Sequence, residues 1–267
     1  MQLRSVFFKC VHDQWRAVFG WSVFAALMPA MYVAIYPSFG EAKMIQQFID
    51  QLPEAYRALF ASTGVDMSTA TGYLNIELFS FVGPLLLLAV GVALGASATA
   101  GEEEGGTADL LLANPIRRSR VVAEKAAAMI LWTFAVAAAV WIGVAAASVA
   151  VGVELALDRV AVALVDCALL GVAYGGVALL VGAVLGKRMA AFAVALMLAV
   201  VAYFVNALAP MVTGWKNAQV ISPFYWYIGN DPLRNGLDPV HAFALAAMAA
   251  ACIVLAAVAW ERRDIRG

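Results

Sequence analysis

Charged residues are scarce in this chain of 267 residues. They make up 13% of it, whereas a soluble domain usually carries about 25%. Apolar residues make up 64%, and the mean hydropathy is +0.86. A water-soluble protein of this length could not bury so much apolar surface in one core. The scarcity of charge therefore excludes a soluble protein and indicates an integral membrane protein, and the net charge of −1 gives no basic field for nucleic acid.

Cysteine and histidine are also few. The three cysteines, Cys10, Cys167 and Cys252, lie far apart and form no CxxC pair, and the two histidines lie near the ends of apolar runs. These spacings support neither a zinc site nor a redox motif. The sequence therefore predicts no metal ion in this chain.

Nucleotide-binding and catalytic motifs are missing as well. The nearest string to a phosphate-binding P-loop ends at Gly186-Lys187, but Val181 and Arg188 stand where that motif needs Gly and Ser or Thr. The G-x-S-x-G string of serine hydrolases is missing too. We therefore expect no catalytic residue, no cofactor in this chain and no enzyme activity.

Six long stretches are almost free of charge, and each is long enough to cross a membrane, which takes about 20 apolar residues in a helix. They are 17–40, 78–101, 126–153, 160–186, 189–215 and 241–260. Backbone groups cannot stay unpaired in lipid, and these stretches lack the period of two that a β-barrel needs. The sequence predicts an all-α polytopic membrane protein with six transmembrane helices in a single transmembrane domain, residues 1–267.

The distribution of Lys and Arg predicts the orientation. With the N-terminus inside, the inner segments hold twelve of these residues and the outer segments five. Positive charge concentrates on the cytoplasmic side of membrane proteins. We expect a multi-pass protein of the cell membrane with both termini in the cytoplasm.

Three of the connecting segments have a pattern of their own. Residues 1–16 separate apolar from charged side chains and predict an amphipathic interfacial helix, or else an extension of the first span. Residues 41–77 carry a helical apolar stripe and predict a short helical cap on the outer face. Residues 216–239 are too apolar for a free loop and predict a re-entrant helical hairpin, or else an aromatic belt at the interface.

Among the few polar residues inside the predicted spans, one carboxylate and one amide are candidates for a role in transport. Asp166 interrupts the fourth, and Asn206 lies in the fifth. An intramembrane carboxylate costs roughly 3 kcal/mol on insertion scales and is usually functional or paired. Asp166 is a candidate for the substrate path or for a structural hydrogen bond, and the same two interpretations hold for Asn206.

Small residues follow one face of the fourth span and recur in the second. The glycines concerned are Gly171, Gly175, Gly182 and Gly186 in the fourth and Gly91 and Gly95 in the second. Small faces let helices approach closely in lipid. The pattern indicates tight packing within one subunit or, alternatively, an interface between subunits.

The inner segment between the second and third spans carries the most distinctive string. It combines an acidic patch, a threonine, a leucine cluster, a proline and a basic pair: Glu102, Glu103, Glu104, Thr107, Leu110, Leu111, Leu112, Pro115, Arg117 and Arg118. A solvated loop has little reason to carry three leucines in a row. The string predicts a short, partly apolar helix held in the cytoplasm.

In order and spacing, this string resembles the one that follows the second span in permeases of the type-two ABC exporters, whose Lys at the start of the third span corresponds to Lys125. Ser222-Pro223-Phe224-Tyr225 resembles the family's outer segment before the last span, and the six-span layout extends the resemblance over essentially the whole chain.

The resemblance implies a mechanism. Two permease copies, or two related permeases, would pair in the lipid bilayer, each docked on a cytoplasmic ABC ATPase subunit that holds ATP and Mg²⁺. Residues 102–120 would be the coupling helix. The three leucines would provide its apolar seat in the ATPase, and the acidic patch and the basic pair would set the register. The substrate, a hydrophobic or amphipathic drug, antibiotic or lipid-like compound, would pass between the permeases along the second and fifth spans. The outer hairpin with Phe224 and Tyr225 would act as a gate.

Two other functions stay open from the residues alone. An ion-coupled secondary transporter or channel would be expected to show inverted repeats and acids at the membrane midplane. The chain offers only Asp166 and no clear repeat. A membrane assembly or anchoring protein would not need a helix of the coupling type.

Overall fold

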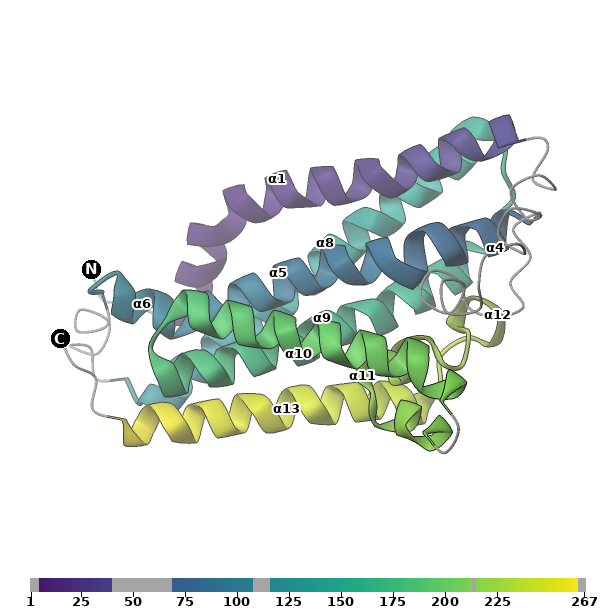
Figure 1. Ribbon diagram of the computed structural model, residues 1–267. Helices are drawn as coiled ribbons and strands as arrows, with labels where there is room; N and C mark the ends of the chain where they lie inside the picture. Colours follow the sequence, from purple (N-terminus) through teal and green to yellow (C-terminus); the bar gives the residue numbers. More distant parts are fainter. Residues whose placement is uncertain (1–4, 40–68, 108–115, 213–214, 264–267) are drawn as a thin grey trace.

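The computed structural model describes residues 5–39, 69–107, 116–212 and 215–263, and within these ranges it is helical and contains no strand. Six helices are long and apolar enough to cross a membrane, which confirms the prediction. Their bounds are Val6–Ser38, Ala70–Ala98, Arg118–Val151, Leu157–Leu185, Arg188–Met211 and Pro239–Arg262. The six form one elongated bundle (Figure 1).

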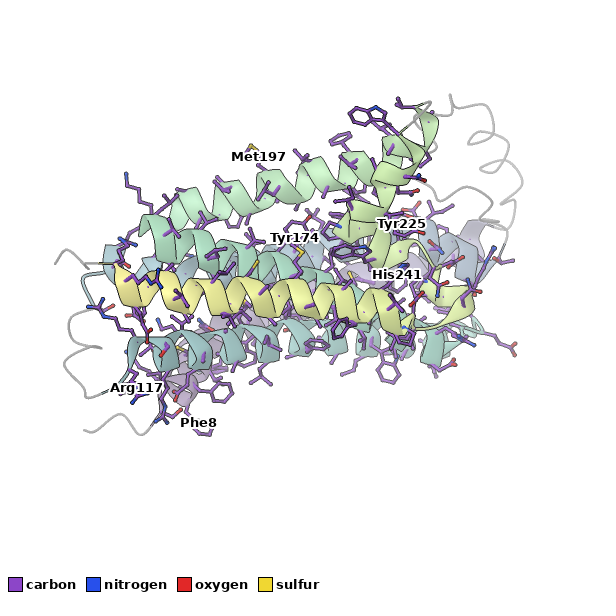
Figure 2. All side chains as sticks on the ribbon, turned by 90° about the horizontal axis from the view of Figure 1, so that it is seen from below. Phe8, Arg117, Tyr174, Met197, Tyr225 and His241 are labelled. Carbon is purple, nitrogen blue, oxygen red and sulfur yellow. The ribbon has the colours of Figure 1, made fainter. Side chains whose placement is uncertain are left out.

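Helix α9 (Leu157–Leu185) is the central element of the bundle. In its most apolar stretch 72% of the residues are buried, against 17% in α13 (Pro239–Arg262) and 22% in α1 (Val6–Ile35) and α10 (Arg188–Leu208). Helices α5 (Gly83–Ala98) and α13 pack on α9, and α1 packs on α8 (Arg118–Val151). The outer helices therefore present most of their apolar side chains outward, as lipid-facing helices do. Figure 2 shows two such side chains, Phe8 of α1 and Met197 of α10.

The second span is not a uniform α-helix. It begins with α4 (Ala70–Leu74), widens into the π-helical segment η2 (Asn75–Val82) and continues as α5. Pro84 is the second residue of α5, two residues after the end of the wide segment. A proline ring collides with the carbonyl four residues earlier and has no N–H to donate, so a wide turn before it relieves the conflict. Ser80 donates its hydroxyl hydrogen to the Asn75 carbonyl at 2.9 Å and satisfies one acceptor there.

Helix α1 runs without interruption from Val6 to Ile35, so the residues expected at the membrane interface are the first turns of the first span rather than a separate helix. Figure 1 shows these turns at an angle to the rest of α1. Glu124 of α8 anchors them: its carboxylate accepts hydrogen bonds from Ser5 Oγ at 3.1 Å and from the Phe7 N–H at 2.9 Å.

The same end of the bundle holds the start of α1, the end of α13 and the short helix α6 (Ala100–Glu104) (Figure 1). The opposite end holds η1 (Tyr36–Phe39), η3 (Ala209–Met211), η4 (Lys216–Ile221), α11 (Pro223–Ile228) and α12 (Pro232–Asn235).

Helix α11 packs against α9, α10 and α13. The re-entry of residues 216–239 into the membrane stays a prediction, and the apolar stripe of 41–77 falls on residues 45–60, outside the described residues.

Candidate coupling site and apolar pocket

The acidic patch lies on α6, directly after the second span. Glu102 accepts a hydrogen bond from Lys125 Nζ of α8 at 2.6 Å, and the Lys125 side chain is only 5% exposed. Thr107 donates its hydroxyl hydrogen to the second carboxylate oxygen of Glu102. Burial raises the pKa of Glu102, but the hydrogen bonds from Lys125 and Thr107 outweigh burial, and the pKa lies below its ordinary value. Glu102 is therefore the charged partner that a buried lysine requires.

Glu103 binds the end of the chain. It accepts hydrogen bonds from Arg263 Nη2 at 2.6 Å and from Trp260 Nε1 at 3.0 Å, and its side chain is 8% exposed. Arg263 also donates through Nη1 to the Ala183 carbonyl of α9 at 3.0 Å. A single buried carboxylate thus joins α6 to the last turns of α13 and, through Arg263, to α9.

Glu104 accepts a hydrogen bond from the backbone N–H of Arg188 at 2.9 Å. Arg188 is the first residue of α10, where N–H groups lack partners within the helix and the helix dipole favours a negative charge. The three neighbouring glutamates therefore bind three different helices, α8, α13 and α10.

The basic pair opens α8. Arg118 donates from Nη1 to the Arg263 carbonyl at 2.8 Å and thereby joins α8 to the end of α13, whereas Arg117 is exposed at this end of the bundle (Figure 2). The leucines Leu110, Leu111 and Leu112 and the proline Pro115 lie outside the described residues.

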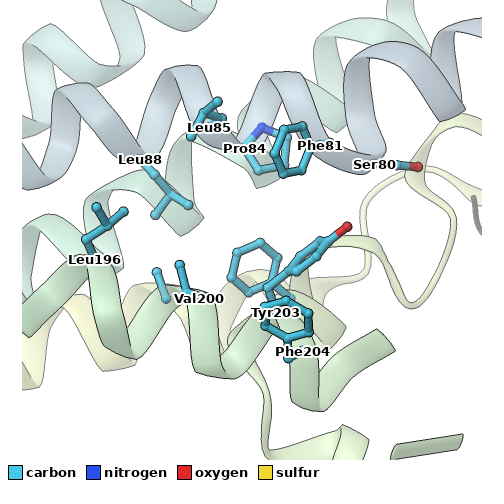
Figure 3. A pocket seen from close by; sticks show the side chains of 11 residues that line it. Ser80, Phe81, Pro84, Leu85, Leu88, Leu196, Val200, Tyr203 and Phe204 are labelled. Atoms are coloured by element: carbon cyan, nitrogen blue, oxygen red, sulfur yellow. The ribbon is translucent and has the colours of Figure 1, made fainter. Parts of the chain in front are cut away.

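An apolar pocket of about 160 Å³ lies between the second span and α10, toward the other end of the bundle (Figure 3). Its walls include Phe81, Pro84 and Leu88 on one side and Val200 and Tyr203 on the other. These are the second and fifth spans, which the resemblance assigned to the substrate path.

The segment between α10 and α13 closes one side of this pocket with Phe224. This ring is buried and lies 5.4 Å from the Tyr203 ring and 6.2 Å from the Tyr174 ring, between centroids. Ser222 fixes the start of α11, since its Oγ accepts from the Phe224 N–H at 3.2 Å and donates to the Ala202 carbonyl at 2.8 Å. Phe224 thus packs against α9 through Tyr174 and against α10 through Tyr203.

Tyr225, the other predicted gate residue, points elsewhere. Its ring lies 5.3 Å from the His241 ring of α13, and Figure 2 shows the two side by side. Tyr227 anchors the segment to the second span, because its hydroxyl donates to the Phe79 carbonyl at 2.8 Å. Burial raises the pKa of Tyr227 well above its ordinary value, so the hydroxyl stays protonated as a donor.

Asp166 and Asn206, the two polar candidates from the sequence, are not brought together with the pocket. Asp166 is 4% exposed, and its Oδ1 has no hydrogen-bond partner among the described residues. Asn206 accepts a hydrogen bond from Gln219 Nε2 of η4 at 3.2 Å. Neither residue lines the apolar pocket.

The glycine faces meet within the chain. A Cβ atom on Gly91 would overlap the carbonyl oxygen of Gly171, and one on Gly95 would overlap that of Gly175. Gly182 faces Thr99, whose Oγ1 would lie 3.3 Å from an added Cβ. The structure therefore places these residues in the contact between α5 and α9 of one chain. Gly186 instead ends α9 with a φ of 63°, a conformation that glycine adopts at little cost.

Sequence reasoning missed two features of the site. Arg263 was counted only as an inner positive charge, although it is the main partner of Glu103. Asn75, at the start of the π-helical segment, donates from Nδ2 to Asp231 Oδ1 at 3.0 Å and joins the second span to the loop before α12. Pro84 was the available signal for an irregular second span.

No cluster of three or more His, Cys, Asp or Glu that could hold a metal ion occurs among the described residues. A comparison with curated protein sequences found no match. A family model described as ABC-2 family transporter protein matches residues 11–265. This covers more than half of the chain and includes all six spans apart from the first turns of α1. The chain belongs to the ABC-2 family of transporter proteins, as the membrane subunit of an ABC transporter.

Proposed function

We propose that the chain is the membrane subunit of an ATP-driven exporter that uses a separate cytoplasmic ATPase subunit. In this proposal residues 102–120 dock on the ATPase, the three leucines form the apolar seat, and two permease copies or related permeases pair in the cell membrane. Both termini lie in the cytoplasm. ATP and Mg²⁺ belong to the ATPase, because this sequence lacks a phosphate-binding loop.

The observation that carries the proposal is the set of contacts made by Glu102, Glu103 and Glu104. The segment after the second span is joined to α8 by an ion pair at 2.6 Å, to α13 by an ion pair at 2.6 Å and to the start of α10 by a hydrogen bond at 2.9 Å. Hydrogen bonds to charged groups are stronger than neutral ones, and the first two of these contacts are largely buried, whereas the third is exposed. A force on this segment would therefore reach three further helices, and the acids would transmit the movement of the docked segment to them.

The apolar pocket supports a hydrophobic or amphipathic substrate. Most of its walls are aliphatic and aromatic side chains of the second span and α10. Its volume of about 160 Å³ is below the roughly 300–1,000 Å³ of pockets that bind drug-sized ligands. One chain therefore supplies part of a substrate site, and a second permease would complete it. Phe224 would act as the gate on one side, held by Tyr203 and Tyr174.

The double substitution Leu111→Asp and Leu112→Asp tests the coupling role. The full chain is purified with its ATPase partner and reconstituted in lipid vesicles. We expect normal membrane insertion and loss of substrate-stimulated ATP hydrolysis, because two carboxylates cannot be buried in an apolar seat.

The matched control is Leu111→Met with Leu112→Met, which keeps both side chains apolar and of similar volume. It should keep the coupled hydrolysis. Unchanged coupling in the Asp variant would contradict the docking assignment. Transport by the purified chain without any ATPase, driven by an ion gradient, would instead favour the secondary transporter.

A further inference from the structure

A second cavity, of about 280 Å³, lies at the α6 end of the bundle. Helices α1, α5, α6 and α8 and the first residue of α10 line it. Unlike the pocket between the second span and α10, it is lined by charged side chains: Asp13 of α1, Glu102 of α6, Lys125 of α8 and Arg188 of α10. Two lining groups are acidic and two are basic, so the cavity carries no net charge.

The four charges fall into two classes. Glu102 and Lys125 neutralise each other at 2.6 Å, and the lowered pKa of Glu102 keeps that pair charged. Asp13 and Arg188 are exposed, and neither side chain forms an ion pair with any of the described residues. The cavity therefore offers one free anion and one free cation over a neutralised pair. A ligand with one positive and one negative group matches both.

The surroundings of Gln14 indicate which kind of positively charged group a ligand would place in this cavity. Its Oε1 is buried and accepts no hydrogen bond from the part of the chain that the structure describes. Gln14 and Asp13 both line the cavity, so an amide oxygen without a donor and a carboxylate without an ion-pair partner border the same space. A primary ammonium carries three N–H donors and could serve both acceptors, whereas a trimethylammonium carries none. A buried acceptor left without a donor costs about 1–3 kcal/mol, so the donor-bearing ligand is favoured.

Exposed aromatic and basic side chains of α1 lie next to the cavity in the sequence. Trp15, one residue after Gln14, is 44% exposed, and the Arg16 guanidinium lies 5.6 Å from its ring centroid. Phe8 and Phe19 of the same helix are 72% and 64% exposed. Of these rings, Trp is the type that is enriched at the boundary between hydrocarbon and headgroups. From these side chains we infer that the cavity is within reach of phospholipid headgroups of that leaflet.

We propose that this cavity binds the phosphoethanolamine headgroup of a membrane phospholipid, with the ammonium at Asp13 and Gln14 and the phosphate at Arg188. This proposal is independent of ATP coupling and of the substrate. The bound lipid would fill the space between α1 and α6 and hold the start of the first span against the acidic patch.

Native mass spectrometry of the detergent-purified full chain tests the site. Phosphatidylethanolamine, phosphatidylcholine and phosphatidylglycerol with identical acyl chains are titrated separately. We expect phosphatidylethanolamine to bind about tenfold more tightly than phosphatidylcholine, since one hydrogen bond to a charged group has that effect. Asp13→Asn should remove most of this preference, whereas Arg188→Gln should weaken the binding of both lipids, because both carry the phosphate.

Glu261→Gln and Arg262→Gln are the matched controls, because both residues are exposed at the same end and neither lines the cavity. They should leave the preference unchanged, and all four variants should match the unsubstituted chain in thermal midpoint without added lipid. Equal binding of the three lipids, tighter binding of phosphatidylglycerol, or a preference that survives Asp13→Asn would overturn the proposal. Displacement of the lipid by equimolar soluble phosphoethanolamine would overturn the assignment to a membrane lipid.

Discussion

The close contact between α5 and α9 predicts how much stability the chain loses in Gly91→Ala and Gly95→Ala. In each case the new Cβ would lie well inside 3.0 Å of a backbone carbonyl oxygen of α9, and backbone cannot move aside as a side-chain tip can. The two helices would have to separate by about 1 Å to reach ordinary contact. Overpacking of this kind costs about 1–3 kcal/mol.

The assay is the thermal midpoint of the purified chain in detergent. At about 2–4 °C per kcal/mol, each variant should lose roughly 2–12 °C. Gly20→Ala is the matched control, because nothing lies within 4 Å of its added Cβ. It should hold or gain stability, since Ala favours a helix over Gly by up to about 1 kcal/mol. A Gly91→Ala variant as stable as Gly20→Ala would refute the packing of α5 on α9 through these glycines.

Three further predictions concern single side chains. Because Glu102 has a lowered pKa in the folded chain, its contribution to stability is present above the ordinary value of 4.5 and is lost as the pH falls through the lowered one. The difference in thermal midpoint between the unsubstituted chain and Glu102→Gln should therefore shrink below that pH, and a constant difference would contradict the ion pair with Lys125. The Asp166→Asn variant should still transport substrate with the ATPase partner, because Asp166 has no charged partner among the described residues and does not line the apolar pocket. Loss of transport at an unchanged thermal midpoint would instead assign Asp166 to the substrate or ion path. Phe224→Ala should lower stability by about 3–5 kcal/mol, more than Tyr225→Ala, as measured by denaturation, and the reverse order would contradict the buried packing of Phe224.

The six spans were predictable because lipid imposes one dominant condition, a long apolar helix. The residues at which the spans begin were harder to predict. A charge-free criterion placed the second span at 78 and the third at 126, whereas the helices begin at Ala70 and Arg118. A charged residue such as Glu77 or Lys125 stops the charge-free stretch, but it does not end a helix when it lies near the helix end or has a partner.

The site was only partly predictable for a different reason. The acidic patch was visible as a string, but Lys125 lies 23 residues from Glu102, and Arg263 lies 160 residues from Glu103. A hydropathy pattern carries no information about such ion pairs, because they depend on which helix ends meet in three dimensions. The glycine face was visible too, yet its period could not distinguish packing on α5 from packing on another subunit.

Sided labelling of the segment after α6 tests the central claim most directly. In a chain whose native cysteines are replaced, Leu111→Cys is exposed to a membrane-impermeant maleimide, with Leu237→Cys in the loop before α13 as the control for the opposite side. We expect Leu111→Cys to react only in inside-out vesicles and to be protected when the ATPase partner is bound, and Leu237→Cys to react in intact cells. Reaction of Leu111→Cys in intact cells, or the same rate with and without the ATPase, would contradict the account.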